Sequence, residues 1–142
     1  MMNRALKKSQ KLFAQQLIHR CDVFAKKRTR VGSQWQEVYM EVVHQHACRM
    51  STKGASDSER NTENQQKFVD SYTLFSLPMD IKQDYRVLLY TKQGATWIPG
   101  SFYEVKGVPR DPSFIGHHYE VPCEVMPTTY TIVEMNGIRI LE

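Results

Sequence analysis

The segment Tyr119–Val125 constrains the fold more than any other stretch of the chain, because it alternates apolar and acidic side chains. The residues at odd positions are Tyr, Val, Cys and Val, whereas Glu120 and Glu124 occupy even positions. A period of two indicates a strand with one packed face and one face in water. Residues 101–108 form a similar run, joined to this segment by a turn that contains Pro and Gly. The pair predicts part of the wall of a small barrel.

Comparable runs, separated by turn residues, occur along most of the chain. Their content of β-branched and aromatic residues predicts further strands at 20–30, 35–53, 67–77, 85–90 and 96–98. The first two are joined by a hairpin turn at Gly32, and the second is so long that it must bend or bulge. The last is expected to be a short edge strand stopped by Pro99-Gly100.

These patterns predict one domain of mainly β class over residues 1–142, with a small antiparallel barrel of six to seven strands at 20–126. Residues 127–142 are expected to add a strand, or a hairpin about Asn136-Gly137. Residues 3–19 predict an N-terminal amphipathic helix, with an apolar stripe opposite a stripe of basic side chains. Residues 51–66 contain no large apolar residue and predict a long mobile loop between the second and third strands.

Charge is distributed unevenly along the 142 residues. Residues 1–53 hold 11 basic and 3 acidic side chains, a net charge of +8, whereas residues 54–142 hold 8 basic and 12 acidic ones, a net charge of −4. This asymmetry suggests a polyanion near one end of the chain, head-to-tail contact between copies, or only a solvated basic surface. No apolar stretch approaches the ~18 residues of a membrane span, and no signal peptide is expected.

Groups capable of catalysis or metal binding are sparse in the sequence. His44, His46 and Cys48 share a face of the second strand, but neighbours on that face are about 7 Å apart, so no metal site is expected. His117 and His118 are adjacent in a strand and should point to opposite faces. The cysteines, which are Cys21, Cys48 and Cys123, are expected to be reduced. With no phosphate-binding loop or serine-nucleophile motif, we expect neither an enzyme nor a cofactor.

A short basic run follows the first buried residues. It consists of Lys26, Lys27, Arg28 and Arg30, with Phe24 and Trp35 close in sequence. Such a run can contact phosphates while an aromatic ring stacks on a base. It is equally typical of a hairpin exposed to water, so we expect these residues to face either DNA, a partner or solvent.

Several motifs in this order resemble the head-closure (stopper) proteins of long-tailed bacteriophages, within the broader head–tail joining family. The resemblance covers roughly residues 20–126. It rests on Cys21-Asp-Val-Phe, Trp35-Gln-Glu-Val, Ala47-Cys-Arg-Met-Ser before the polar loop, Tyr72-Thr-Leu-Phe-Ser-Leu-Pro, Phe102-Tyr-Glu-Val and Gly116-His-His-Tyr-Glu-Val. The helix at 3–19 departs from the family, because many relatives begin near the first strand.

The resemblance implies a structural protein of the virion neck, assembled in the host cytoplasm. Such proteins form a ring, often of twelve subunits, in which each subunit is a small β-barrel. The implied partners are the adaptor on the portal side, the tail terminator or tail tube on the other side, and genomic double-stranded DNA in the channel, with no membrane. The adaptor is expected to add an extended segment to an edge of the barrel.

The resemblance also assigns a role to the polar loop Ser51–Gln66. In some members this loop projects into the channel, closes it after packaging and moves aside when the genome leaves. Carried onto this chain, the channel residues are Lys53, Gly54, Asp57, Glu59, Arg60 and Glu63. Two basic and three acidic side chains between residues 53 and 63 give a net charge of −1, and a weakly negative lining repels DNA.

Three other functions stay open at this point. The tail terminator is another ring of the same neck, whereas the adaptor is disfavoured because adaptors are mainly helical. A monomeric nucleic-acid-binding barrel would use residues 4–30 as a basic arm. An enzyme would require the histidines to converge in a pocket, which their expected strand positions oppose.

Overall fold

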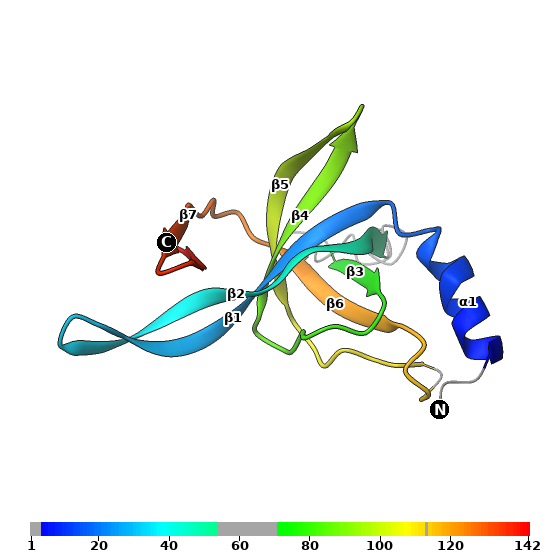
Figure 1. Cartoon of the computed structure of the whole chain (residues 1–142), viewed down its shortest axis with the longest axis horizontal. Coiled ribbons are helices and arrows are strands. Elements are labelled where there is room, and N and C mark those ends of the chain that lie inside the picture. Colours follow the sequence, from blue (N-terminus) through cyan, green and yellow to red (C-terminus); the bar gives the residue numbers. More distant parts are fainter. Residues whose placement is uncertain (1–3, 54–70, 113) are drawn as a thin grey trace, which may run out of the picture.

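The computed structural model describes residues 4–53, 71–112 and 114–142 (Figure 1). Helix α1 spans Arg4–Ala14. The strands are β1 (His19–Val31), β2 (Gln34–Lys53), β3 (Ser71–Ser76), β4 (Arg86–Gln93), β5 (Thr96–Val105), β6 (Tyr119–Val125), β7 (Ile132–Met135) and β8 (Ile138–Leu141). The fold is therefore mainly β, as the alternating sequence pattern predicts.

Six of the strands form a barrel-like sheet in which neighbours are antiparallel. Their order is β1-β4-β5-β6-β3-β2, and a further pairing between β1 and β2 closes the sheet partly into a ring. The β7–β8 hairpin continues the sheet beyond β2, through the pairs Tyr39–Leu141 and Met40–Ile140. The predicted small antiparallel barrel with an N-terminal helix is thus confirmed.

The interior of the barrel is filled by the apolar faces of its strands. Val121 and Cys123 of β6 are 0% and 3% exposed, and Glu120 and Glu124 lie on the other face of the strand. The buried side chains that pack with them come from the other strands and include Cys21, Val23, Leu74, Val87 and Val105. The face predicted from the alternation of β6 is confirmed.

A second apolar cluster lies on the outside of the barrel, under the C-terminal segment. Its buried members are Phe24, Leu88, Tyr90, Phe102 and Leu141. Because neighbouring residues of a strand point to opposite faces, β1 contributes Val23 to the inner cluster and Phe24 to the outer one. Strand β1 is consequently buried on both faces where it crosses the barrel.

The C-terminal hairpin turns at the dipeptide that the sequence indicated. Asn136 and Gly137 have φ angles of 54° and 80°. A two-residue turn of this kind requires positive φ at both positions, which Asn and Gly tolerate better than other residues. The hairpin predicted within residues 127–142 is confirmed.

Strands β1 and β2 run beyond the barrel as a long two-stranded hairpin, on the side away from helix α1 (Figure 1). Gly32, with φ of 66°, forms its turn. At the other end, β2 leaves β1 and pairs with β3 as far as Lys53 and Ser71. The hairpin turn and the connection at residues 54–70 are therefore attached to opposite ends of the 20-residue strand β2.

Strand β2 bulges where it crosses the barrel, as its length predicts. Its register against β1 shifts between Cys21 and Val23 and again between Val23 and Phe24. Gln45, at the first shift, has a φ of 51°. A bulge places two residues of one strand opposite one residue of the other and interrupts the alternation of faces. This interruption determines where the neighbouring histidines lie.

Two predicted boundaries in this part of the chain are wrong. Helix α1 ends at Ala14 rather than at residue 19, in a turn with i→i−3 hydrogen bonds from Gln16 and Leu17. Residues 51–53, which the sequence assigned both to the second strand and to the polar loop, complete β2, so the strand boundary at 53 is confirmed and the loop boundary at 51 is wrong. The rest of that loop, and residues 67–70 of the predicted third strand, lie outside the described residues.

The expected stop at Pro99-Gly100 is also wrong, because β5 continues through both residues. The first part of β5 pairs with β4, and its pairing with β6 begins at Tyr103. Pro99 therefore lies in the part of β5 that pairs on one side alone, which is where a strand tolerates proline. Of the helices described, none is long and apolar enough to cross a membrane.

Candidate functional site

The four basic residues predicted to face DNA, a partner or solvent lie in the projecting hairpin, on two different faces. Lys26, Arg28 and Arg30 share one face of β1, whereas Lys27 lies on the other, opposite Val38. The cross-strand neighbours of the first three are Tyr39, Glu37 and Trp35. We call this set the basic face: Lys26, Arg28, Arg30, Trp35, Glu37 and Tyr39.

The side chains of the basic face interact weakly with one another. Lys26 Nζ lies 3.1 Å from Glu37 Oε2, and this hydrogen-bonded pair raises the pKa of Lys26. Both side chains are more than half exposed, so the ion pair contributes little to stability. The Arg28 guanidinium lies 6.0 Å from the ring centre of Trp35, which is 60% exposed. The basic face thus presents cations and a large aromatic ring to solvent.

The predicted channel loop is placed by its attachment points. Lys53 is the last residue of β2, and its partner Ser71 is the first residue of β3. The remaining channel residues lie outside the described residues: Gly54, Asp57, Glu59, Arg60 and Glu63. Residues 54–70 therefore connect two adjacent strands of the barrel, and both attachment points lie at the same end of those strands.

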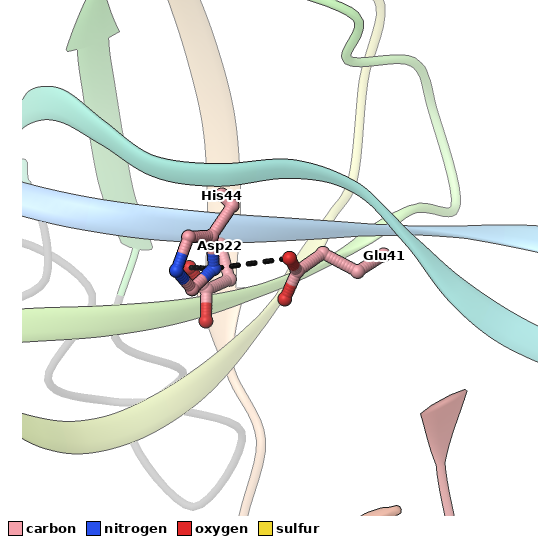
Figure 2. A group of neighbouring side chains, drawn as sticks. All are labelled: Asp22, Glu41 and His44. Carbon is pink, nitrogen blue, oxygen red and sulfur yellow. Dashed lines mark ion pairs between the residues drawn. The ribbon is translucent and has the colours of Figure 1, made fainter. Parts of the chain in front are cut away.

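A cluster of charged side chains that the sequence did not indicate lies on the outer face of the barrel (Figure 2). Asp22 of β1 is 0% exposed, and Glu41 and His44 approach it from β2. His44 Nδ1 is 3.0 Å from Glu41 Oε1 and 3.3 Å from Asp22 Oδ1. The ligand atoms of the three residues lie within 4.8 Å of one another, a spacing that a metal ion can bridge.

The cation that the structure places among these groups is Arg139 of β8. Its Nη1 donates to Asp22 Oδ2 at 3.1 Å, contacts Glu41 Oε2 and lies 2.7 Å from His44 Nδ1. A guanidinium in this position balances the charge of the two carboxylates and bonds to them directly. We therefore interpret the cluster as a connection that fixes the C-terminal hairpin to the barrel.

Hydrogen bonds satisfy the buried Asp22 carboxylate from other directions as well. The Tyr90 hydroxyl donates to Oδ2 at 2.6 Å, and the backbone N–H of Gln45 donates to Oδ1 at 2.8 Å. Burial and the hydrogen bond to Asp22 raise the pKa of Tyr90, so this hydroxyl remains a donor. Burial, followed by the charge of Asp22, raises the pKa of Glu41. Asp22 and Glu41 thus share the guanidinium of Arg139, and Asp22 accepts additional hydrogen bonds from Tyr90 and from the backbone of Gln45.

The predicted common face of His44, His46 and Cys48 is wrong for His44, whereas His46 and Cys48 do share a face of β2. His46 pairs with Cys21, whose neighbour Asp22 lies on the opposite face of β1 and contacts His44. Because the bulge at Gln45 interrupts the alternation, His44 and His46 lie on opposite faces. A sequence pattern of period two has no means of signalling such a bulge.

The prediction for His117 and His118 is also wrong, because β6 begins after them, at Tyr119. Their Nδ1 atoms lie 2.7 Å apart, and His118 Nε2 is 3.2 Å from Glu120 Oε2. On the other side, Ser9 of α1 lies 2.8 Å from His117 Nε2. The rings meet because Gly116, with φ of 74°, turns the chain just before them.

A chain of hydrogen bonds links Ser9, His117, His118 and Glu120. Its sequence of side chains resembles that of a serine nucleophile, its base and an orienting acid. Ser9 lies within α1, where the N–H groups of its own turn are bonded along the helix and cannot form an oxyanion hole. Phe13 stacks on His118 at 4.5 Å between ring centres, and Gln10 donates to the carbonyl oxygens of Gly116 and His117. We interpret the arrangement as the docking site of α1.

The cysteines Cys21, Cys48 and Cys123 are free and buried. Burial raises the pKa of Cys123 to about 12, and a hydrogen bond with Cys48 is the main cause of the raised pKa of Cys21. Because the thiolate is the reactive form, these thiols act as core residues.

Comparisons of the chain with protein-family models, with curated proteins and with solved structures find no match. The function is therefore inferred from the residues and their arrangement.

Proposed function

We propose that this protein is a ring-forming head-closure subunit of a bacteriophage neck, which joins the DNA-filled head to the tail and helps to retain and gate the genome. The observation that carries the proposal is the insertion of residues 54–70 between adjacent barrel strands, at Lys53 and Ser71. This is the position that the resemblance gives to the loop of the channel. The order of the sequence motifs supports the same function.

The arrangement suits a mechanical role. A barrel with an inner and an outer apolar cluster forms a stiff wall, which can hold the attachment points of the loop at a constant separation. A ring of such subunits would direct its loops towards a common axis. The loop carries a net charge of −1 between residues 53 and 63, so it would obstruct DNA by its bulk and repel it rather than bind it.

Reconstitution with DNA-filled heads that lack this protein tests the proposal. Adding the purified chain should increase the nuclease-protected DNA that the heads retain, and should make them competent to accept tails. A variant lacking residues 54–63 should still bind the heads but retain less DNA. If the complete chain neither binds heads nor protects their DNA, the proposal is wrong. Binding to isolated tails instead of heads would identify a tail terminator.

A monomeric nucleic-acid-binding barrel is the second candidate, and the basic face favours it. Three cations and an exposed Trp35 on one projecting hairpin could contact phosphates and stack on a base. This function predicts binding of the free chain to short oligonucleotides that weakens steeply with salt. The neck function predicts weak binding by the free subunit, because only an assembled ring surrounds DNA.

A further inference from the structure

We propose that the basic face of the β1–β2 hairpin docks on a second copy of this chain, against the acidic outer face of strands β5 and β6. The contact joins two different surfaces of the same protein, so that each copy offers both a hairpin and an acceptor. Contacts of this head-to-tail type close into rings when the rotation between copies allows it.

The hairpin has the form of an unpartnered interaction surface. From Lys26 to Glu37 it is a two-stranded ribbon whose side chains are mostly exposed on both faces. A two-stranded ribbon by itself is marginally stable in water, so a covering partner would stabilise it. Arginine and tryptophan, which are the residue types that carry most binding energy at protein interfaces, lie together at its tip as Arg28, Arg30 and Trp35.

One observation favours a protein over DNA as the occupant of the basic face. Glu37 lies within the face and would meet any phosphate backbone as a like charge. The inference rests on the proposed function in one respect, because the contact would join neighbouring subunits of the ring.

The acceptor is a part of the outer face where carboxylates outnumber the cations beside them. Glu104 of β5 and Glu124 of β6 are direct cross-strand partners, an arrangement of like charges that destabilises a sheet. Lys106 Nζ lies 3.1 Å from Glu104 Oε2, and its other acidic neighbours are Glu124 and Asp84. Arg86 of β4 is the other cross-strand partner of Glu104, and its guanidinium stacks on Tyr39 and Tyr130. Three carboxylates beside Lys106 and Arg86 leave a net charge of −1, which a cationic hairpin complements.

Zero-length cross-linking tests the contact directly, because a carbodiimide joins lysine ammonium groups to carboxylates that touch them. A mixture of unlabelled and ¹⁵N-labelled full-length chain distinguishes bonds between copies from bonds within one copy. We expect mixed-isotope peptides that link Lys26 to Glu104 or Glu124. Cross-linked peptides that are all of one isotope would overturn the proposal.

A pair of charge-reversal variants sharpens the test. The hairpin variant K26E/R28E/R30E and the acceptor variant E104K/E124K should each associate about tenfold more weakly than the natural chain in sedimentation experiments, since each places like charges together. Mixed together they should associate again, because each hairpin then meets an acceptor of opposite sign. K27E is the matched control, since Lys27 lies on the other face of the hairpin and should leave association unchanged.

The outcomes separate this inference from its rivals. Loss of association in both variants without recovery on mixing would contradict it, as would a natural chain that sediments as a monomer at every concentration. Circular dichroism melting shows whether each variant is folded. If the acceptor variant does not fold, the cross-links and the hairpin variant still test whether the hairpin contacts a second copy. Oligonucleotide binding that only the hairpin variant loses would identify DNA as the occupant. A hairpin variant that still completes heads would overturn the inference and leave the proposed function standing.

Discussion

The charged cluster around Asp22 and the basic face of the hairpin lie on the same face of β1, only a few residues apart, yet their surroundings differ completely. Asp22 is fully buried and bonded to Arg139, Tyr90 and the backbone of Gln45. Lys26 and its neighbours are exposed, and their ion pair lies in water. One strand thus carries charges that hold the fold together and charges that remain available to a partner.

This comparison indicates that burial determines the role of a charged side chain in this protein. A charge taken out of water must be paired and hydrogen-bonded, so removing its partner is costly. An exposed charge can be changed with little effect on stability, so its cost or benefit appears in binding. The four predictions below test this distinction, from the largest expected effect to the smallest.

The largest effect is expected from Val121→Asp, which buries a carboxylate without the donors that Asp22 has. Val121 is 0% exposed in the apolar interior of the barrel. The substituted chain should fail to fold, because an unpaired buried charge costs more than a small domain can compensate. Circular dichroism of the purified variant checks this, and a cooperative native-like melt would show that our assignment of the inner face is wrong.

Arg139→Met should be the next most damaging change, because it leaves Asp22 buried beside Glu41 without its cation. Breaking a buried ion pair in this way costs about 3 kcal/mol. Urea unfolding should therefore show a large loss of stability. Arg30→Met, the same substitution on the exposed hairpin, is the control and should stay within about 0.5 kcal/mol of the natural chain. Equal losses of stability in the two variants would contradict the distinction between buried and exposed charges.

Glu41→Gln should alter how stability depends on pH. The pKa of Glu41 in the folded chain is raised above its ordinary value of 4.5. The folded state therefore binds this proton more readily, so the natural chain gains stability as the pH falls from the raised value to about 4.5. The variant should lack this gain and should be at least as stable at neutral pH, since Arg139 then balances Asp22 alone.

Urea unfolding between pH 4 and 8 measures the effect, with Glu37→Gln on the exposed hairpin as the matched control. The control should follow the natural chain across this range. A Glu41→Gln variant that is less stable than the natural chain at neutral pH would mean that Glu41 holds Arg139 in place.

The smallest effect on stability is expected from deletion of residues 54–63. These residues contain no large apolar side chain, so the deletion removes nothing that a core needs. The thermal midpoint should remain close to that of the natural chain. A collapse of the fold would refute the assignment of this segment as an insertion between β2 and β3.

Local patterns in the sequence predicted most of the fold. The alternation in β6 identified its buried face, because one side of a strand that faces the barrel interior must be apolar. Gly32 and the Asn136-Gly137 dipeptide identified hairpin turns, because each needs a backbone conformation that few residues tolerate. Boundaries failed where pairing outweighed local signals, as at Pro99 in a stretch that pairs on one side alone.

The charged cluster could not be predicted, because its members come from distant parts of the chain. Asp22, Glu41 and Arg139 meet only when β1, β2 and β8 are assembled. His44 joins them through a bulge whose position has no sequence signature. The basic residues of the hairpin were recognised because four of them lie within five positions. Their division into two faces also required the strand register.

The measurement that tests the account most directly is electron cryomicroscopy of DNA-filled, tail-less heads after incubation with the purified full-length chain. The neck function predicts an additional ring of density at the portal vertex, with barrel-shaped subunits in contact with their neighbours. Heads without added density, together with a free chain that binds short oligonucleotides in a salt-sensitive manner, would contradict it and favour the nucleic-acid-binding barrel.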